Sequence, residues 1–243
     1  MNKISYLAGV TAFGLTVWQG TVWIAGVPHF ILPSPRRVAQ VGWENRVLIG
    51  ENALVTGFEV AMGLVLGVLL GAVTAVQLAR SDRLYRLVMP LLVFTQAVPV
   101  FALAPILTLW LGYGMASKVM MAILIIYFPV TSAFYDGLTR VPQDVTDMAR
   151  TMNGTNWQVM WRIRIPHALP SLATGLKLAA VYAPLGAVIG EWVGASRGLG
   201  YLMLLANGRA KTDLMFARLV VLAIMTIGLH LAVKRAALRM QWE

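Results

Sequence analysis

The sequence contains no cysteine and few charged residues. Without cysteine the chain forms no disulfide bond, thiolate metal site or cysteine nucleophile. Only 12% of its 243 residues are Asp, Glu, Lys or Arg, and 58% are hydrophobic, whereas a soluble domain has about 25% charged residues. Several apolar stretches exceed the roughly 18 residues that mark a membrane-spanning helix. We therefore predict an all-α polytopic membrane protein.

Motifs for catalysis are also missing. A phosphate-binding loop needs Gly-x4-Gly-Lys-Ser/Thr, and the sequence has no Gly-Lys pair. The His-Glu-x-x-His motif is absent, and His29, His167 and His230 have no ligand-like spacing. We therefore predict no enzymatic activity, cofactor or metal in this chain. The net charge of +10 fits basic cytoplasmic loops better than nucleic-acid binding, because no basic run with interleaved aromatics occurs.

About six transmembrane helices are predicted, all within a single domain of residues 1–243. The predicted spans cover residues 4–27, 52–79, 87–111, 118–136, 170–193 and 214–233. An amphipathic surface helix is expected at 36–49, and a short re-entrant or interfacial helix at 202–207. More Lys and Arg residues lie on the side of the termini than on the opposite side, which favours cytoplasmic termini.

A row of glycines marks the second span. Gly63, Gly67 and Gly71 recur every four residues and share one helix face. Small residues at this spacing let another helix backbone approach closely. We interpret the row as a packing face, although glycine is also frequent in membrane helices in general.

The third span contains Pro90, Pro99 and Pro105. Proline removes a backbone donor and bends a helix, and broken helices at membrane depth are tolerated beside protein or an aqueous cavity. The span is therefore a candidate pathway wall or moving element, with Gln96 and Pro99 as its candidate pathway residues. A kink that only helps packing is the alternative.

Two carboxylates lie in or at the end of predicted spans, where burying a charge is costly. Glu191 ends the fifth span beside the glycine-rich turn 194–201, and Glu59 lies inside the second span. We take Glu191 as a candidate gate residue. The alternative is an interfacial carboxylate that anchors a loop.

One hydrophilic segment, residues 141–166, interrupts the apolar stretches. Asp144 and Asp147 suit the start of a helix, and the Asn153–Gly154 pair breaks it. A second helical pattern follows at 157–165, ends at Pro166, and span five begins at Pro170. We predict a helix, a turn and a helix along the membrane that dock a soluble partner, with a solvated loop as the alternative. The predicted apolar side consists of Val145, Met148, Met152 and Val159.

This segment resembles the cytoplasmic signature of the membrane subunits of binding-protein-dependent ABC importers, Glu-Ala-Ala-x3-Gly-x9-Ile-x-Leu-Pro. Asp147-Met148-Ala149 stands at the start and Ile163-Arg164-Ile165-Pro166 at the end. Asn153 falls at the usual glycine position and Gly154 comes one later. The departures put the turn geometry in question. By this resemblance the ATPase-coupling residues are Asp147, Met148, Ala149, Arg150, Met152, Asn153, Gly154 and Pro166.

The resemblance extends over nearly the whole chain and is greatest to the taurine, sulfonate and nitrate branch. The segments 99–105 and 190–202 look similar to permeases for thiamine pyrimidine precursors such as hydroxymethylpyrimidine. A fold like that of type I ABC importer permeases is implied, in a bacterial inner membrane, with 142–166 as a coupling-helix loop. The implied partners are a second permease copy, two cytoplasmic ATPases that hold ATP and Mg, and an extracytoplasmic solute-binding protein. The rival interpretations are an ion-driven secondary transporter and a non-transporting membrane scaffold. Few charges within the spans and the lack of two related halves in the sequence argue against the secondary transporter.

Overall fold

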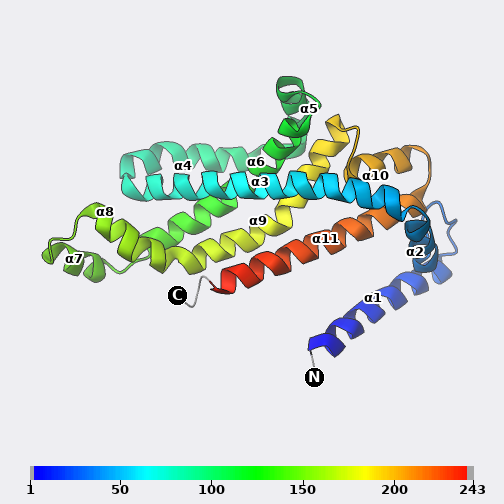
Figure 1. The fold of residues 1–243 in the computed structure, drawn as a ribbon, viewed down its shortest axis with the longest axis horizontal. Coiled ribbons are helices and arrows are strands. Elements are labelled where there is room, and N and C mark those ends of the chain that lie inside the picture. Colours follow the sequence, from blue (N-terminus) through cyan, green and yellow to red (C-terminus); the bar gives the residue numbers. More distant parts are fainter. Residues whose placement is uncertain (1–2, 240–243) are drawn as a thin grey trace.

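The computed structural model describes residues 3–239, and within them the chain is helical with no β-strand. This agrees with the predicted all-α membrane protein. In Figure 1, α3, α9 and α11 run along the long axis, with α7 and α8 at one end and α2 and α10 at the other. The elements are α1 (Lys3–Ala25), α2 (Pro35–Glu44), α3 (Arg46–Arg80), α4 (Asp82–Ala97), α5 (Val100–Leu111), α6 (Met115–Thr139), α7 (Gln143–Thr151), α8 (Asn156–Val159), the π-helical η1 (Met160–Arg164), α9 (Ile165–Gly194), α10 (Leu199–Gly208) and α11 (Thr212–Arg239).

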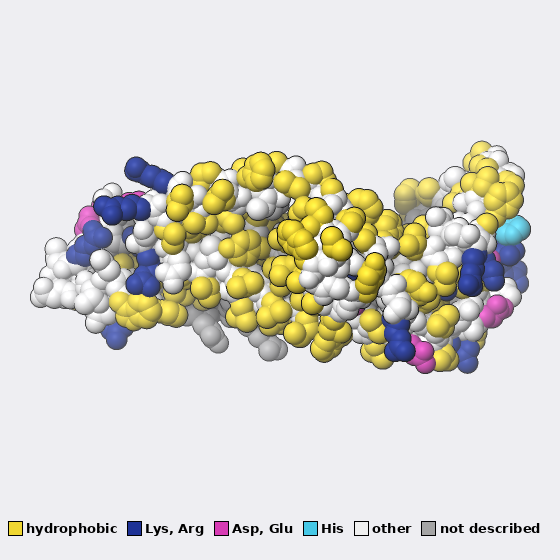
Figure 2. All heavy atoms as spheres, turned by 90° about the horizontal axis from the view of Figure 1, so that it is seen from above, with side chains coloured by type: hydrophobic (Ala, Val, Ile, Leu, Met, Phe, Trp, Pro, Cys, Tyr) yellow, Lys and Arg dark blue, Asp and Glu magenta, His cyan; other side chains and the backbone are white. Residues whose placement is uncertain are grey.

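Four helices of the described chain are long and apolar enough to cross a membrane. They are α3, α6, the continuous run Asn156–Gly194, and Thr212–Leu238 of α11. The bent pair α4–α5 makes a fifth if it counts as one span. Helix α1 forms where the first span is predicted. Hydrophobic side chains cover the middle of the molecule and charges gather at its two ends (Figure 2).

The third predicted span, 87–111, is not a single kinked helix. Helices α4 and α5 meet at an angle of 101°. Val98, with φ −83° and ψ 122°, is extended, and Pro99 caps the start of α5. A residue before proline is driven out of the helical region and proline has no N–H to continue the ladder. Pro90 and Pro105 lie within their helices, so only Pro99 stands at the break.

The predicted surface helix at 36–49 ends earlier than expected. Helix α2 stops at Glu44, and residues 46–49 already belong to α3. Asn45 leaves the helical conformation with φ −102° and ψ 17°, and its side-chain amide donates to the carbonyl of Val41 at 2.9 Å. Asparagine competes with the backbone in this way, so the chain changes direction between α2 and α3 (Figure 1).

The helix break predicted at Pro166 is also wrong. Residues Asn156–Gly194 form one continuous helix of 39 residues, with Pro166 in the first turn of α9 and Pro170 inside it. A π-helical turn at Met160–Arg164 precedes the proline, and the N–H of Ile165 bonds to the carbonyl of Met160. Single π turns are inserted into α-helices in this way. Pro166 therefore removes one donor beside an already widened turn, and the helix continues.

Helices α3, α6 and α9 pack closely around small residues. A Cβ atom built on Gly63 would lie 2.5 Å from the Cβ of Ala122, and one on Gly67 would lie 2.6 Å from Cδ1 of Ile126. The equivalent atom on Gly71 would lie 3.0 Å from Cγ1 of Val130. The three glycines thus face α6 at separations that leave no room for a side chain. Buried alanines of α9, namely Ala179, Ala183 and Ala187, pack in one cluster with Ile126 and Val130 of α6 and Val60 of α3.

Candidate functional site

Within the hydrophilic segment 141–166, helix α7 is the part that is not continuous with the long helix of α8 and α9. It projects from one end of the molecule (Figure 1). Asp144 lies in its first turn and Arg150 in its last, which matches the sign of the helix dipole at each end. Arg150 also lies 3.4 Å from the carboxylate of Asp147, and both side chains are about half exposed. The predicted first helix of the segment is therefore present, and its charged side chains are placed favourably for the helix dipole.

The turn after α7 explains why asparagine stands where the signature has glycine. Asn153 has φ +58°, the left-handed conformation that glycine and asparagine adopt most readily. Its N–H bonds to the carbonyl of Arg150, and the N–H of Gly154 bonds to the carbonyl of Ala149, both at 2.9 Å. This pair of bonds is a Schellman motif. A Cβ on Gly154 would lie 2.7 Å from that Ala149 oxygen, so the position needs glycine.

Helix α8 begins immediately after this turn and joins α7 to α9. Thr155 and Gln158 form a capping box, in which the Thr155 N–H donates to Gln158 Oε1 at 2.8 Å and the Gln158 N–H donates to Thr155 Oγ1 at 3.3 Å. The rings of Trp157 and Trp161 lie 5.3 Å apart. From α8 the helix runs without interruption to Gly194. Helix α7 is therefore attached, through α8, to the end of a long helix.

The outer face of α7 carries exposed apolar side chains. Met152 is 74% exposed, Met148 is 64% and Val145 is 42%, while Val159 is buried at 5%. Three of the four predicted apolar positions therefore share an open surface, and Val159 packs inward. Large apolar side chains on an otherwise polar, projecting helix make this face a candidate surface for a protein partner. Methionine suits such surfaces because it adapts its shape.

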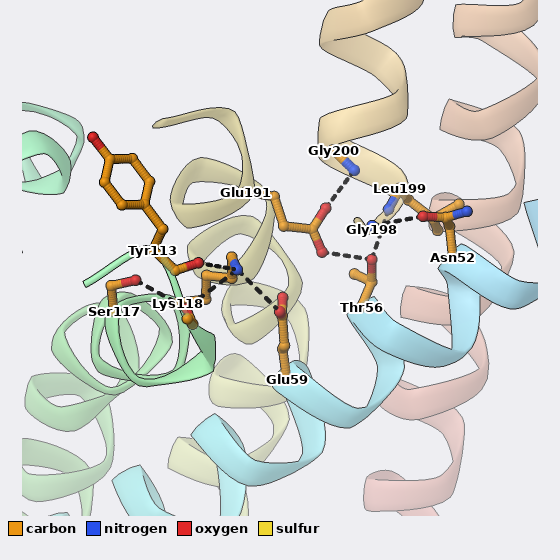
Figure 3. Close-up of polar contacts among 11 residues, drawn as sticks. Asn52, Thr56, Glu59, Tyr113, Ser117, Lys118, Glu191, Gly198, Leu199 and Gly200 are labelled. Carbon is orange, nitrogen blue, oxygen red and sulfur yellow. Dashed lines mark hydrogen bonds and ion pairs between the residues drawn. The ribbon is translucent and has the colours of Figure 1, made fainter. Parts of the chain in front are cut away.

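A second polar site lies in the interior, near the opposite end of α3 from α7 (Figure 1, Figure 3). Glu191 is 1% exposed, and its Oε1 accepts the hydroxyl of Thr56 at 2.6 Å while its Oε2 accepts the N–H of Gly200. Asn52 accepts the N–H of Gly198 at 2.7 Å. Side chains of α3 and α9 thus hold the turn that leads into α10, because they satisfy its backbone donors.

An ion pair extends this site. The Lys118 ammonium on α6 lies 3.7 Å from Oε1 of Glu59 on α3, and both side chains are buried. Lys118 also donates to the backbone carbonyls of Tyr113 and Gly114 at 3.3 and 3.2 Å. The other carboxylate oxygen of Glu59 has no hydrogen-bond partner. Figure 3 shows the Glu59 and Glu191 carboxylates on the same side of α3. We call these residues, Asn52, Thr56, Glu59, Lys118 and Glu191, the buried polar cluster.

The sequence interpretation named Glu191 and Glu59 in this cluster and missed the others. Asn52 and Thr56 precede Gly63, Gly67 and Gly71 on the same face of α3 at the same spacing of about four residues. That polar extension of the glycine row was the available signal. No such pattern marks Lys118, because only the packing of α6 against α3 brings it to Glu59.

The other candidate pathway residues lie elsewhere. Gln96 is exposed near the end of α4 and donates to the hydroxyl of Thr95 at 3.4 Å. Pro99 is exposed at the break between α4 and α5. The structure therefore does not bring either residue to Glu191. A role for Gln96, Pro99 and Glu191 in a gate or pathway remains a prediction.

Replacing Glu191 by alanine should loosen the turn before α10. The change removes the acceptor of two buried donors, and hydrogen bonds to a charged group contribute about 1.5–3 kcal/mol each. We expect amide hydrogen exchange at Gly198–Gly200 to become roughly a hundredfold faster, since about 1.4 kcal/mol corresponds to a factor of ten. Glu51→Ala, at an exposed position of α3, is the control. Unchanged exchange in the Glu191 variant would show that the turn is held by other contacts.

No cluster of three or more His, Asp or Glu side chains that could hold a metal ion occurs among the residues described. The described residues form two candidate functional regions at opposite ends of α3. One is the projecting helix α7 with its apolar face. The other is the buried polar cluster with the turn that it holds.

The chain is similar to several known proteins. Residues 63–239 match the family "Binding-protein-dependent transport system inner membrane component". A probable ABC transporter permease protein of Haemophilus influenzae is 46% identical over 229 residues, covering 94% of both chains. The formylaminopyrimidine transport permease protein of Halalkalibacterium halodurans is 33% identical, covering 91% of this chain and 88% of its own. An inward-facing structure of the MetNI methionine ABC transporter has a TM-score of 0.62 at 20% identity and covers 84% and 95% of the two chains.

Proposed function

This chain belongs to the family of inner-membrane components of binding-protein-dependent transport systems, and we propose that it couples ATP hydrolysis on a partner chain to the import of a small organic nutrient. The family resemblance and the fold of a type I importer permease, both predicted from the sequence, are confirmed. The chain is thus an ABC importer permease, a transport component. Its substrate, its partners and the residues that transmit force form the proposal.

The exposed apolar face of α7 is the observation that carries the coupling step. Met148 and Met152 lie on a helix that makes little contact with the rest of the molecule. Burying these two side chains in a cleft of an ATPase would stabilise the complex by about 1.5–3 kcal/mol each. Because the Schellman turn and the capping box join α7 rigidly to α9, movement of the ATPase would tilt α9 and switch the permease between inward-open and outward-open states.

The proposed assembly is a homodimer of the permease with two cytoplasmic ATPase subunits and an extracytoplasmic solute-binding protein. ATP and Mg bind to the ATPases. In this proposal residues 1–243 form one permease domain, 142–166 is its coupling-helix loop, and both termini are cytoplasmic. The fold shared with an ABC transporter permease supports it, as does the excess of Lys and Arg on the side of residues 142–166.

A thiamine pyrimidine precursor is the proposed substrate. Support comes from the segments 99–105 and 190–202 and from the relative that is named for formylaminopyrimidine. Taurine and sulfonates are the alternative, because permeases named for them are also similar, at 25% and 27% identity. Uptake of labelled hydroxymethylpyrimidine, formylaminopyrimidine and taurine should be compared in cells with and without this chain. Uptake of taurine alone would reverse the assignment.

Replacing Met148 by glutamate should uncouple the ATPase. A carboxylate on the docking face would have to lose its water on binding, which costs several kcal/mol without a partner charge. We expect at least a tenfold loss of uptake and of co-purified ATPase, with the same amount of permease in the membrane.

Gln143→Glu adds the same charge to the exposed first turn of α7, away from the apolar face, and should leave both readouts near the natural level. If the Met148 variant keeps its ATPase, α7 is not the docking helix. If vesicles that hold the permease alone accumulate substrate in an ion gradient, the chain is a secondary transporter.

A further inference from the structure

A basic pocket lies between the α3–α4 turn and the start of α8. Its volume is about 380 Å³, and its polar lining consists of Arg80, Asp82, Arg150, Asn156, Trp157 and Arg164. Figure 2 shows Lys and Arg side chains gathered at this end of the molecule. Three guanidinium groups and one carboxylate line it, and Arg150 also pairs with Asp147 at 3.4 Å. The three arginines and two carboxylates leave the pocket with a net positive charge. We refer to it below as the basic pocket.

The arginines of the pocket have donors to spare. The guanidinium of Arg80 lies 5.3 Å over the ring of Trp157 and makes no ion pair in the described structure. Arg164 donates one N–H to the carbonyl of Ala79 at 3.3 Å, and its Nε is buried without a hydrogen-bond partner. A buried, unpaired donor of this kind is rare and costs free energy. This Nε is enclosed, so an anion in the pocket would bind the remaining guanidinium N–H groups of Arg80 and Arg164.

An apolar groove on α4 continues from the basic pocket. Asp82 lines both the pocket and a small depression beside it that includes Arg83 and Arg86. Arg86 in turn lines the groove, whose apolar wall is Met89, Pro90 and Val93. Along the first three turns of α4 the surface thus changes from basic side chains to apolar ones. A basic surface followed by an apolar one suits an amphiphile better than a free anion.

We propose that the basic pocket and the α4 groove bind an anionic phospholipid, with its phosphate among Arg80, Arg150 and Arg164 and an acyl chain against Met89 and Val93. Arginine is the residue of choice for phosphate because its fork of N–H groups matches the phosphate oxygens. Trp157 is of the type enriched at membrane–water interfaces. The lipid would join Arg150 of α7 to Arg80 of α3. It would thereby limit the movement of α7, the helix proposed to dock the ATPase.

Binding of dioleoyl phosphatidylglycerol and dioleoyl phosphatidylcholine to the full chain in neutral detergent can be counted by native mass spectrometry. The natural chain should retain phosphatidylglycerol in preference to phosphatidylcholine. Arg80→Gln/Arg150→Gln should weaken phosphatidylglycerol binding roughly thirtyfold, because each basic residue contributes about a fivefold preference for anionic lipid. Both side chains are exposed, so the variant should fold normally.

Arg36→Gln/Arg209→Gln is the matched control, since it removes the same charge from exposed positions at the α2–α10 end. It should bind phosphatidylglycerol like the natural chain. Met89→Gln should weaken lipid binding as well. An equal loss in the control would mean non-specific attraction and would overturn the site. Displacement of the lipid by millimolar inorganic phosphate, or no effect of Met89→Gln, would assign the pocket to free phosphate and overturn the lipid.

Discussion

Replacing Lys118 by methionine should destabilise the helix bundle by about 3–5 kcal/mol, the usual cost of removing one partner from a buried ion pair. Lys118 holds Glu59 at 3.7 Å, and both side chains are more than nine-tenths buried. Without the ammonium group the Glu59 carboxylate remains buried beside Glu191 with no opposite charge. The carbonyls of Tyr113 and Gly114 also lose their donor. The measurement is the free energy of unfolding in mixed micelles by titration with dodecyl sulfate.

A double variant separates the charge from the packing. Glu59→Met/Lys118→Met removes both charges and keeps similar volume, so its stability should lie within about 1–2 kcal/mol of the natural chain. Lys211→Met is the control, because Lys211 is exposed and should contribute less than about 1 kcal/mol. If the double variant is as unstable as Lys118→Met alone, the packing of the long side chains matters and the charge pair does not.

Much of the fold could be predicted because membrane helices can be recognised in a sequence by their length and apolar composition. The spans around 52–79, 118–136, 170–193 and 214–233 all correspond to observed helices. Errors arose where backbone chemistry at one residue decided the outcome. Proline ended a helix at Pro99 and failed to do so at Pro166, where a neighbouring π turn had already altered the hydrogen bonding. Sequence alone does not show that turn.

The two functional regions differed in how far the sequence revealed them. The segment with α7 could be recognised because its signals are local, namely the acidic first turn, the apolar positions and the Asn153–Gly154 pair. The buried polar cluster draws on α3, α6 and α9, and its members are far apart in the sequence. Its one regular signal is that Thr56 and Asn52 continue the row of glycines on α3. That signal can be recognised only by extending the packing face of α3 beyond its glycines.

Helices α3 and α9 connect these regions physically. Helix α3 carries Arg80 at the end with α7 and Asn52 at the end with the α10 turn, and the run Asn156–Gly194 extends from α8 to Glu191 and beyond. A tilt imposed through α7 would therefore act on the contacts of Glu191 with Thr56 and Gly200. How far such a tilt travels depends on how firmly α9 is packed against α6.

Replacing Gly186 by alanine should disrupt that packing. A Cβ atom on Gly186 would lie 2.5 Å from the Cα and 2.9 Å from the N of Ala122, so the α6 backbone itself would have to move. Overpacking a tight core costs about 1–3 kcal/mol for small additions and more for large ones. We expect a loss of at least about 2 kcal/mol for Gly186→Ala, and no folded permease for Gly186→Leu, by thermal unfolding and size-exclusion chromatography. Gly228→Leu in α11, where nothing lies within 4 Å, is the control and should fold normally.

Ala122 also lies against Gly63, and this allows a decisive comparison. A Cβ on Gly63 would lie 2.5 Å from the Cβ of Ala122, with the Ala122 Cα 3.8 Å away. Ala122→Gly removes that Cβ, so it should restore most of the stability lost in Gly63→Ala. The same change should not rescue Gly186→Ala, because there the obstacle is the Ala122 backbone, which remains. Rescue of both variants would mean that α6 and α9 can move apart easily, and α9 could not then transmit a tilt from α7 to the buried polar cluster.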